Sequence, residues 1–414
     1  MKRTILLAAM AMFGFVSNAQ TAGSVAQGAG YANQVYYKFS SNASTASIPA
    51  ASWDIAFLRT SAFSMGIRVN DSRIQTYEVG ATSVWPTVDV TQEATWTRLY
   101  NSDVEWEVGS LDNGTATYGW GEYNPVTHHV VGSKVFVLKI TAGTTSTYKK
   151  IKIDDFFAGY TFTYSTWDGS AWTADTTQTV ANAASANRFF NYFNLTTNAT
   201  VEVEPVNTDW DLLFTQYVTD YAGGVDNKYK VTGVLSHPDV QVAQHEQPSG
   251  LPANFSPTYG EQINVIGFDW KALNSSFQYT VDSNQAFFVK LANGTVYRLT
   301  FNTFVGSSTG VTTFNQQDVT SQLDAAQFEN KVSFSVFPNP SVDKKITVLY
   351  DGANASAKNM VSVFSLTGAK VFERNLESNG FAQSDINLSN LNAGVYILKF
   401  QSGEYSTTKK IVLQ

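Results

Sequence analysis

The chain has 414 residues, of which 43% are hydrophobic, so it can bury more than one sizeable core and is not a wholly disordered protein. Only 15% of the residues are charged and 14% are aromatic, a composition that favours β-sheets and turns over helical bundles. The formal charge of -7 argues against nucleic acid as a partner, and a cysteine count of 0 excludes disulfides, thiolate nucleophiles and zinc–thiolate or iron–sulfur sites.

The first 19 residues have the layout of a secretory signal peptide. Lys2 and Arg3 form a short basic start, an apolar stretch runs from Ile5 to Val16, and small residues precede the expected cleavage after Ala19. The apolar stretch is too short to span a bilayer, and no later segment approaches about 18 consecutive apolar residues. We therefore expect an exported protein without a transmembrane segment.

An internal repeat follows the signal peptide. The tract Tyr36–Asn42 and the motif Trp53–Phe57 reappear as Tyr192–Asn198 and Trp210–Phe214, with an offset of 157 between the two tryptophans. Side chains alternate along an extended strand, so the motif predicts that its Trp, its third residue and its Phe share one buried face. The Asp of each motif is expected to point the other way or to turn back and cap a backbone group.

Each copy of the repeat also contains a hairpin pattern. The first copy has Phe136–Ile140 before Gly143, and the second has Phe288–Leu291 before Gly294. The glycines supply the positive φ that a tight hairpin turn requires. Long helical periodicity is hard to find in the mature chain. The sequence therefore predicts an all-β fold with two tandem antiparallel modules, at residues 20–185 and 186–315.

The last part of the chain reads as a separate domain. Residues 316–331 are polar, with a helix-compatible pattern at Ser321–Asn330, and are expected to form a linker. Pro338 and Pro340 fix a turn at the start of the domain at residues 332–414. A small β-sandwich is predicted from six short alternating strands, at Lys345–Leu349, Met360–Leu366, Lys370–Asn375, Ser384–Leu388, Gly394–Gln401 and Thr407–Leu413.

This terminal domain resembles the type A C-terminal sorting domain of the type IX secretion system. The motif residues that carry the resemblance are Pro338, Asn339, Pro340, Gly368, Gly394, Tyr396, Gly403, Lys409 and Lys410. The resemblance implies recognition by the type IX secretion machinery and passage across the outer membrane of a Bacteroidota-type bacterium. The protein would then be secreted or attached to the outer cell surface. Such a domain specifies the export route and does not indicate the function of the residues before it.

The repeated part is similar to the HmuY family of surface haem-binding proteins. The first module carries this similarity in Trp53–Phe57, Arg68–Asn70, Trp120, Thr127–His129 and the hairpin at Phe136 to Lys149. The second module keeps the Trp–Asp motif and the hairpin but has Asn274–Ser276 near the place of the histidines. The chain departs from the lipoprotein members of the family because it has no cysteine anchor.

The similarity implies that haem is the cofactor or ligand, held by axial side chains. The candidate haem ligands are His128, His129, His237 and His245. Adjacent residues on a strand point to opposite faces, so at most one of His128 and His129 can serve a given pocket, and one of them is the first choice. His237 and His245 lie in a stretch expected to be exposed. The alternative is that all four are surface or hydrogen-bonded histidines, and no other metal site is expected.

Enzyme signatures are weak, so we expect a binding protein with no catalytic residues. Gly306–Gly310 fits the Gly-x-Ser-x-Gly formula, but no histidine follows it and no helix is expected there. Asp154 with Asp155, and Glu202 with Glu204, are read as solvated edge charges instead of a glycosidase pair. A rival function is glycan binding or adhesion, because Trp167 and Trp172 flank an expected hairpin tip.

Overall fold

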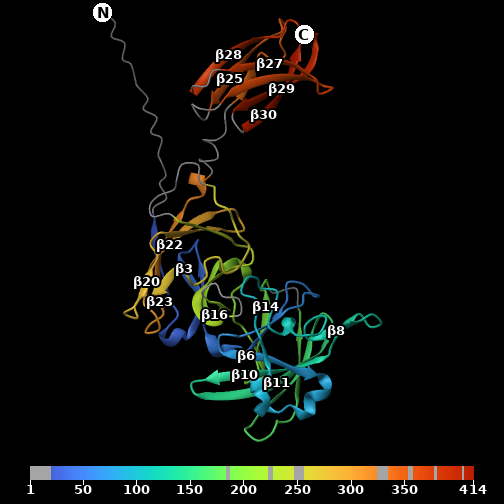
Figure 1. The fold of residues 1–414 in the computed structure, drawn as a ribbon, viewed down its shortest axis with the longest axis vertical. Coiled ribbons are helices and arrows are strands. Elements are labelled where there is room, and N and C mark those ends of the chain that lie inside the picture. Colours follow the sequence, from blue (N-terminus) through green and yellow to red (C-terminus); the bar gives the residue numbers. More distant parts are fainter. Residues whose placement is uncertain are drawn as a thin grey trace, which may run out of the picture. The chain divides into compact units, whose positions relative to one another are not determined.

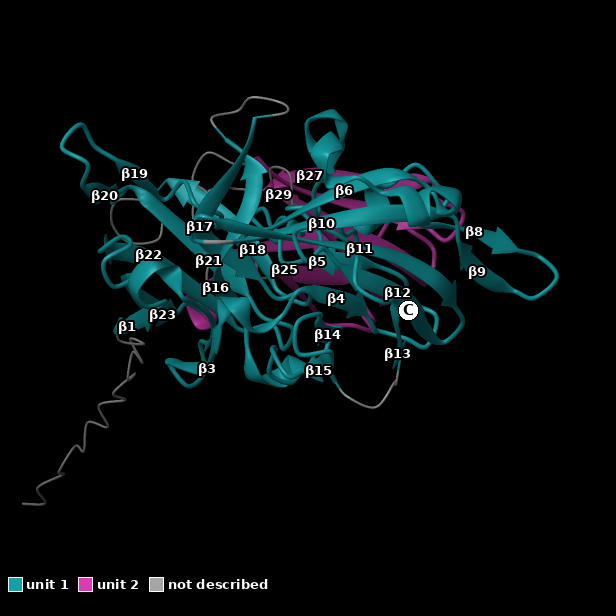
Figure 2. Cartoon of the chain, turned by 90° about the horizontal axis from the view of Figure 1, so that it is seen from below, with its two compact units in different colours: residues 1–250, 257–319 teal, residues 251–256, 320–414 magenta. Residues whose placement is uncertain are grey.

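The computed structural model describes residues 20–182, 187–221, 227–246, 256–323, 334–352, 358–376, 380–402 and 405–414. The expected signal peptide, residues 1–19, lies outside the described residues. The chain divides into two compact units, residues 1–250 with 257–319 and residues 251–256 with 320–414 (Figure 2).

The described residues are mostly β-strand, in agreement with the all-β expectation (Figure 1). Helical structure is limited, within these ranges, to 3-10 turns and to residues 320–323 of the expected linker. The 3-10 turns are η1 (Ala29–Tyr31), η2 (Ala50–Ser52), η3 (Thr82–Thr87), η4 (Val90–Thr95), η5 (Leu111–Asn113) and η6 (Asn207–Asp209).

The first unit contains two lobes, A and B, each with one large antiparallel sheet. The main path of the lobe A sheet runs through β13 (Thr176–Ala181), β12 (Gly159–Thr166), β11 (Thr145–Phe156), β10 (Lys134–Ala142), β6 (Ile74–Ala81) and β7 (Thr97–Leu99), with β9 (His129–Gly132) beside β11 and β8 (Gly121–Asn124) beside β9. The lobe B sheet runs through β1 (Thr21–Ala26), β23 (Val311–Asp318), β22 (Val296–Phe304), β21 (Gln285–Lys290) and β18 (Gln241–Glu246).

Each lobe has a second sheet of four strands. In lobe A it runs through β15 (Ala199–Val201), β14 (Phe190–Asn194), β4 (Ile55–Leu58) and β5 (Ile67–Val69). In lobe B it runs through β3 (Ala43–Pro49), β2 (Asn33–Lys38), β16 (Leu212–Asp220) and β17 (Lys228–Ser236). The Trp–Asp motifs lead into β4 and β16, which occupy the same place in the two sheets, so the sequence repeat corresponds to a repeated strand order.

The expected boundary between residues 185 and 186 does not separate the lobes. Lobe A is continuous from β4 to β15, residues 55–201, whereas lobe B combines β1–β3, residues 21–49, with β16–β23, residues 212–318. The N-terminal arm, defined as residues 20–49, enters lobe B because β1 pairs with β23 and β2 pairs with β16. Local patterns predict strands but not their distant partners, so the expected modules have wrong boundaries.

Alternation along the strands divides the buried side chains among three clusters. Ile55 and Phe57 on β4 enter the lobe A core, and Leu212 and Phe214 on β16 enter the lobe B core. The residues between them, Ala56 and Leu213, belong to a cluster shared by both lobes. This inter-lobe cluster consists of Tyr36, Ala56, Leu58, Phe189, Phe190, Tyr192, Val203, Trp210 and Leu213. β4 and the first residues of β16 are therefore buried on both faces.

The two tryptophans of the motifs do not share a face with the residues two positions later, contrary to the sequence prediction. Trp53 packs against the inter-lobe cluster and Trp210 belongs to it, whereas Ile55 and Leu212 lie in the lobe cores. The reason is that each Trp comes directly after a 3-10 turn, η2 or η6, and before the strand begins. Strict strand alternation therefore does not yet apply at Trp53 or Trp210.

Two hairpins project from the first unit (Figure 2). One is β8–β9 in lobe A, and the other, in lobe B, is β19 (Lys271–Leu273) with β20 (Tyr279–Val281). Both follow a buried tryptophan, Trp120 or Trp270. Both also contain a residue at positive φ, His128 at 61° and Phe277 at 57°. These hairpins are thus another element that the two lobes share.

The second unit is a β-sandwich. One sheet runs through β24 (Phe334–Phe337), β25 (Lys345–Gly352) and β28 (Gly380–Asn387), and the other through β27 (Lys370–Leu376), β26 (Asn359–Ser365), β29 (Gly394–Ser402) and β30 (Tyr405–Leu413). The core between them includes Val348, Val363, Leu398, Phe400 and Ile411. The six strands predicted for this domain are present as β25 to β30.

Candidate functional site

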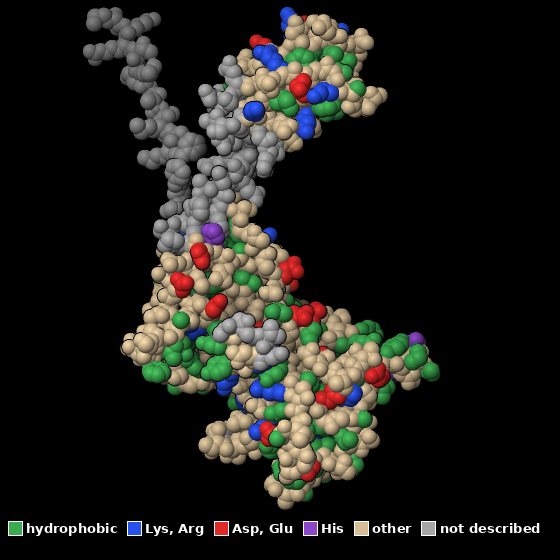
Figure 3. All heavy atoms as spheres, viewed as in Figure 1, with side chains coloured by type: hydrophobic (Ala, Val, Ile, Leu, Met, Phe, Trp, Pro, Cys, Tyr) green, Lys and Arg blue, Asp and Glu red, His purple; other side chains and the backbone are tan. Residues whose placement is uncertain are grey.

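His128 and His129 lie at the β8–β9 hairpin, at whose outer end a histidine is visible beside hydrophobic side chains (Figure 3). Nδ1 of His128 is 2.6 Å from the Tyr123 hydroxyl. Nδ1 of His129 is 2.9 and 2.8 Å from the two carboxylate oxygens of Asp155, and its ring stacks on Phe157 with centroids 4.7 Å apart. Each imidazole therefore has a polar partner at Nδ1, and Nε2 is the nitrogen that it can offer to a ligand.

His237 and His245 lie on lobe B. The expectation that His237 is exposed is wrong: its ring lies 4.5 Å from that of Trp210 and 4.9 Å from that of Phe189, and burial lowers its pKa to about 4. His245 is half-buried on β18, where it lies opposite Ala286 of β21. The four histidines are therefore divided between the two lobes and have different surroundings, so the candidates do not form one site.

A cavity of about 530 Å³ lies between the 105–107 segment and lobe B. Its lining includes four carboxylates, from Glu105, Glu107, Asp239 and Glu261, and no histidine. The propionates of haem are anionic and would be repelled by these side chains. This cavity therefore does not support the haem hypothesis.

A smaller cavity of about 50 Å³ lies between the lobes, beside Arg68 and Tyr192. The Arg68 guanidinium donates to the carbonyls of Ser102, Glu105, Trp106 and Val108 at 2.7 to 3.2 Å, and it fixes the 101–108 segment over the cavity. A volume of about 50 Å³ can hold one or two water molecules but not a tetrapyrrole.

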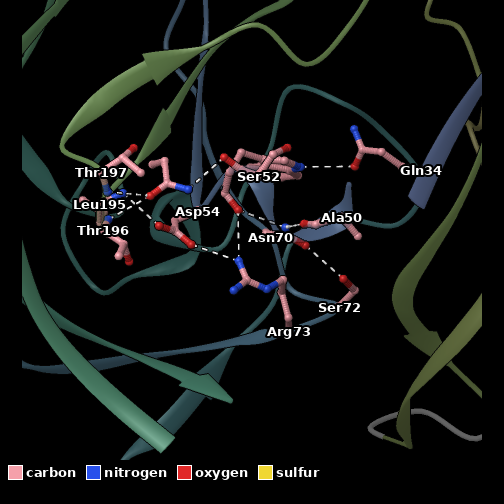
Figure 4. Close-up of polar contacts among 12 residues, drawn as sticks. Gln34, Ala50, Ser52, Asp54, Asn70, Ser72, Arg73, Leu195, Thr196 and Thr197 are labelled. Carbon is pink, nitrogen blue, oxygen red and sulfur yellow. Dashed lines mark hydrogen bonds and ion pairs between the residues drawn. The ribbon is translucent and has the colours of Figure 1, made fainter. Parts of the chain in front are cut away.

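The Asp of the first Trp–Asp motif is a structural junction (Figure 4). Asp54 is 2% exposed; one of its carboxylate oxygens accepts from the Leu195 amide at 2.8 Å, and the other accepts from Arg73 Nη1 at 3.0 Å. The same Arg73 nitrogen lies 3.3 Å from the Trp53 carbonyl, to which the side-chain amide of Asn70 also donates at 3.0 Å. Asp54 therefore caps a backbone group, as one of the two sequence expectations has it.

Asp211 has the equivalent role in lobe B with fewer partners. Its carboxylate accepts from the Phe39 amide at 2.7 Å, and its own amide donates to the Tyr37 carbonyl at 2.8 Å. The Asp54 amide donates in the same way to the Phe193 carbonyl at 2.9 Å. Both aspartates thus attach a strand end to the start of the neighbouring strand, which is a structural role and not a catalytic one.

Glu204 is a carboxylate buried beside the inter-lobe cluster. It accepts from the Phe190 amide at 2.8 Å and from the Tyr192 hydroxyl at 3.2 Å. Burial raises the pKa of Glu204 from 4.5 to about 7. Between these two pH values the folded chain holds a proton on Glu204 that the unfolded chain has released, so the folded state binds more protons there.

We expect Glu204 to make folding stability fall as the pH rises from about 4.5 to 7. Its contribution is complete below pH 4.5 and is lost as the pH rises through about 7. Glu204→Gln removes the titration and keeps an acceptor for Phe190. The free energy of unfolding of the variant, relative to wild type, should therefore rise by about 3 kcal/mol across this window.

Urea unfolding at pH 4.5 and pH 7.5 measures this difference. Glu202→Gln is the matched control, because the Glu202 side chain is 78% exposed and pairs only with Arg188 at 2.9 Å among the ion pairs of the described chain. A difference between Glu204→Gln and wild type that does not change with pH would show that the Glu204 pKa is not raised.

The residue groups that could suggest catalysis have structural partners. Gly306 and Gly310, with φ of 81° and 63°, lie in the turn between β22 and β23, without a helix. Asp154 accepts from the Thr163 hydroxyl at 2.6 Å and contacts Lys152, whereas Asp155 contacts His129. Glu204 is buried, so its interpretation as a solvated edge charge is wrong.

Trp167 and Trp172 pack on each other at a hairpin tip, with centroids 5.3 Å apart. Neither ring is fully exposed to solvent, because both side chains are half-buried. The Trp172 indole donates to the Val88 carbonyl at 2.8 Å, and Lys150 Nζ lies 5.0 Å from its ring centre. The expected pair of displayed rings is therefore largely part of the packing on the outer face of the lobe A sheet.

Lobe A displays aromatic rings elsewhere, at a place that sequence patterns did not predict. Phe63, between β4 and β5, is 62% exposed, and Phe157, between β11 and β12, is 51% exposed. Their ring centroids are 5.6 Å apart at an interplanar angle of 69°. Together with His129 and Asp155 they form a surface that we call platform A. The sequence feature that could have indicated this surface is a single Phe among small residues, in Thr60–Ser64.

Lobe B displays rings where β16 ends and β17 begins. Tyr221 is 45% exposed and Tyr229 is 60% exposed, with centroids 5.3 Å apart. Phe268 stacks on Tyr221 at 5.8 Å with an interplanar angle of 24°. We call these three residues platform B. Because β4 and β16, and β5 and β17, are equivalent, Phe63 and Tyr221 lie on corresponding connections of the two lobes.

The sorting-motif residues have identifiable structural roles. The Asn339 side chain donates to the Lys410 carbonyl and accepts from the Val412 amide, both at 2.8 Å, and the Ser341 amide donates to the Val412 carbonyl at 2.8 Å. The Pro338–Ser341 segment therefore covers the outer edge of β30. Pro338 and Pro340 both follow cis peptide bonds.

The other motif residues shape turns and strands of the same unit. Gly368 has φ of 85° in the β26–β27 turn, Gly394 begins β29, and the Tyr396 hydroxyl donates to the Asn392 carbonyl at 2.9 Å. Lys409 and Lys410 are exposed on β30. Gly403 lies outside the described residues.

Neither a membrane-spanning helix nor a cluster of metal-ligating side chains occurs among the described residues. Among the helices in these ranges, none is both long and apolar enough to cross a bilayer. No group of three or more histidine, aspartate or glutamate side chains placed to hold a metal ion occurs in the part of the chain that the structure describes.

Residues 335–414 match the family described as the secretion system C-terminal sorting domain, which bears out the expected type IX sorting domain. No curated protein matches the sequence. Among solved structures, the chain is similar to one described as "Biofilm associated protein - BSP domain", at 8% identity, with 97% of this chain and 82% of that chain covered and a TM-score of 0.19. A TM-score this low does not indicate a shared fold, and the HmuY-like resemblance gains no support from these matches.

Proposed function

Because the sorting domain at residues 335–414 directs export and attachment to, or release from, the outer cell surface, we propose that the chain is a non-catalytic surface binding protein that acts as an adhesin. The observation that carries this proposal is the display of paired aromatic rings on connections of both lobes, at platform A and platform B. Exposed rings at repeated places favour recognition of an extracellular partner. The candidate catalytic residues, in contrast, are engaged in packing and capping.

A deletion strain of the producing bacterium tests the adhesin role. We expect cells without this chain to attach several-fold less to a solid surface, measured by counting retained cells after a fixed wash. The full chain supplied on a plasmid should restore attachment, and the matched chain without residues 335–414 should not. Attachment equal to wild type in the deletion strain would reject the adhesin role.

Haem binding is the second candidate function. One observation favours it: the Asp155 carboxylate holds Nδ1 of His129, at 2.8 and 2.9 Å, and so leaves Nε2 for a metal. A carboxylate on the second ring nitrogen is the usual support of a metal-ligating histidine. The rings of Phe157 and Phe63 lie beside it as an apolar surface.

Haemin titration of the full chain tests this candidate. If His128 or His129 holds haem, the Soret band of haemin should shift on binding, and the shift should be lost when both are replaced by alanine. His245→Ala is the control, because His245 lies on β18 of lobe B. A Soret band unchanged at micromolar protein would reject haem binding.

A further inference from the structure

We infer that platform A and platform B are two binding sites for a neutral polysaccharide and that they engage one polymer together. This inference rests on the proposed adhesin function and names its ligand class. It follows from the composition of each platform, from the place of the platforms in the repeated fold and from the size and charge of the exposed surfaces.

Platform A combines apolar rings with hydrogen-bonding groups. Phe63 and Phe157 are 62% and 51% exposed, and their ring centroids are 5.6 Å apart. His129 stacks on Phe157 with an interplanar angle of 11°, so its polar edge lies beside an aromatic face. Asp155 and His129 have side chains that are 37% and 34% exposed, so solvent, or a ligand, can reach both. A pyranose ring has one apolar C–H face and a rim of hydroxyls, which this arrangement complements.

Platform B offers the same kind of surface with different residues. Tyr221 and Tyr229 carry hydroxyls on exposed rings, and Phe268 supports Tyr221 from below by stacking at 5.8 Å. The backbone holds the pair in place, because the Tyr221 amide donates to the Asn227 carbonyl at 3.0 Å and the Asn227 side chain donates to the Tyr221 carbonyl at 3.2 Å. Tyrosine provides both an apolar face and a polar tip, which suits contact with a hydroxyl-rich ligand.

The repeated position is independent support for a common role. The strand pairs β4–β5 and β16–β17 are equivalent, and each platform contains a residue on the connection of such a pair or at its ends. The residue types differ, with phenylalanine and histidine in lobe A and tyrosine in lobe B, yet exposed aromatic rings occur at both places. The correspondence rests on Phe63 and Tyr221, which lie on the two equivalent connections, whereas the other platform residues lie on different elements of their lobes.

Size and charge distinguish a glycan from other partners. A stable protein–protein interface needs about 800 Å² on each side, whereas two half-exposed rings offer roughly 200 Å². A surface of that size matches one or two sugar rings. An anionic bilayer or an acidic polymer is disfavoured because the chain carries a net charge of -7. A neutral polysaccharide fits both the small area of the exposed rings and the negative net charge of the chain.

Two sites on one chain give avidity toward a polymer. A repeating ligand bound at one platform is held at high effective concentration near the other, so binding to the polymer can exceed binding to a short oligosaccharide by a factor of about 10² or more. An oligosaccharide that is too short to span both platforms gains no such advantage. The difference between polymer and oligosaccharide is therefore the signature of two cooperating sites.

Affinity gel electrophoresis of the full chain tests the inference, with laminarin, xylan, pullulan and glycol chitin as probes. Three variants are compared with wild type: Phe63→Ala with Phe157→Ala, Tyr221→Ala with Tyr229→Ala, and all four together. Phe277→Ala is the matched control, because Phe277 is 84% exposed at the β19–β20 turn and lies outside both platforms. Circular dichroism confirms that each variant is folded, as expected for exposed side chains.

We expect at least one polymer to retard wild type and the Phe277→Ala control equally. Each two-residue variant should bind that polymer about a hundredfold more weakly than wild type, with the affinity that wild type has for a pentasaccharide of the same sugar, and the four-residue variant should not bind. The inference is overturned if no polymer retards wild type, or if the four-residue variant binds as wild type does. Loss of cell attachment in the deletion strain together with either result would leave the adhesin function standing and assign it to a protein partner.

Discussion

Removing the N-terminal arm, residues 20–49, should unfold lobe B and leave most of lobe A folded. The arm contributes four fully buried side chains to the lobe B core: Val25, Val35, Tyr37 and Phe39. Each contributes about 1.5–3 kcal/mol by burial, so their combined loss is comparable with the whole stability of a typical domain. The lobe A core contains no residue of the arm among its buried members in the described chain.

Hydrogen exchange of the truncated chain measures this effect strand by strand. We expect amides of β21, β22 and β23 to lose protection by at least a hundredfold, while β10, β11 and β12 stay protected. Adding a synthetic peptide of residues 20–49 should restore protection in lobe B, because the arm is joined to it by strand pairing. Equal loss of protection in both lobes would contradict the division into lobes A and B.

The second large effect is expected at the Trp–Asp junction. Asp54→Ala removes the acceptor of the buried Leu195 amide and the partner of Arg73 (Figure 4). An unsatisfied buried N–H and an unpaired, partly buried guanidinium together should lower the free energy of unfolding by about 3 kcal/mol. The repeat provides an internal comparison, because Asp211→Ala removes only the acceptor of the Phe39 amide among the contacts of the described chain and should cost about 1–2 kcal/mol.

Urea unfolding midpoints of the two variants test this ranking. Asp209→Ala is the control, because the Asp209 side chain is 52% exposed and its pair with Lys38 at 3.3 Å should contribute less than about 1 kcal/mol. If Asp211→Ala proved more destabilising than Asp54→Ala, the number of buried partners would not explain the cost at these positions.

Local features of the fold could be predicted from the sequence. The strands β25 to β30 of the last domain, each seven to nine residues long, are recognisable from alternation, and Pro338 and Pro340 mark the turn before them. Gly143 and Gly294 have φ of 62° and 87°, as expected for the turns of the two hairpins. These features depend on residues close in the chain, so a pattern over a short window is sufficient.

Features that depend on distant residues could not be predicted in this way. The pairing of Thr21 with Gln316 joins strands 295 residues apart, and nothing in either strand alone indicates its partner. His237 was expected to be exposed because it lies in the polar stretch 236–246, but its ring is enclosed by Trp210 and Phe189 from elsewhere in the chain. The platforms could not be predicted for the same reason, because Phe63 and Phe157 are far apart in the sequence and come into contact only in the folded lobe.

The composite construction of lobe B also sets the order of events during biosynthesis. Chains emerge from the ribosome N-terminus first, so β1 and β2 appear long before the strands that receive them. Lobe A has all its strands once residue 201 is available, but β1 must wait for β23, which ends at Asp318. In a nascent chain the apolar residues of the arm therefore have no strand to pair with while lobe A already has all its strands. A chaperone that covers residues 20–49 during this interval would favour correct folding of lobe B.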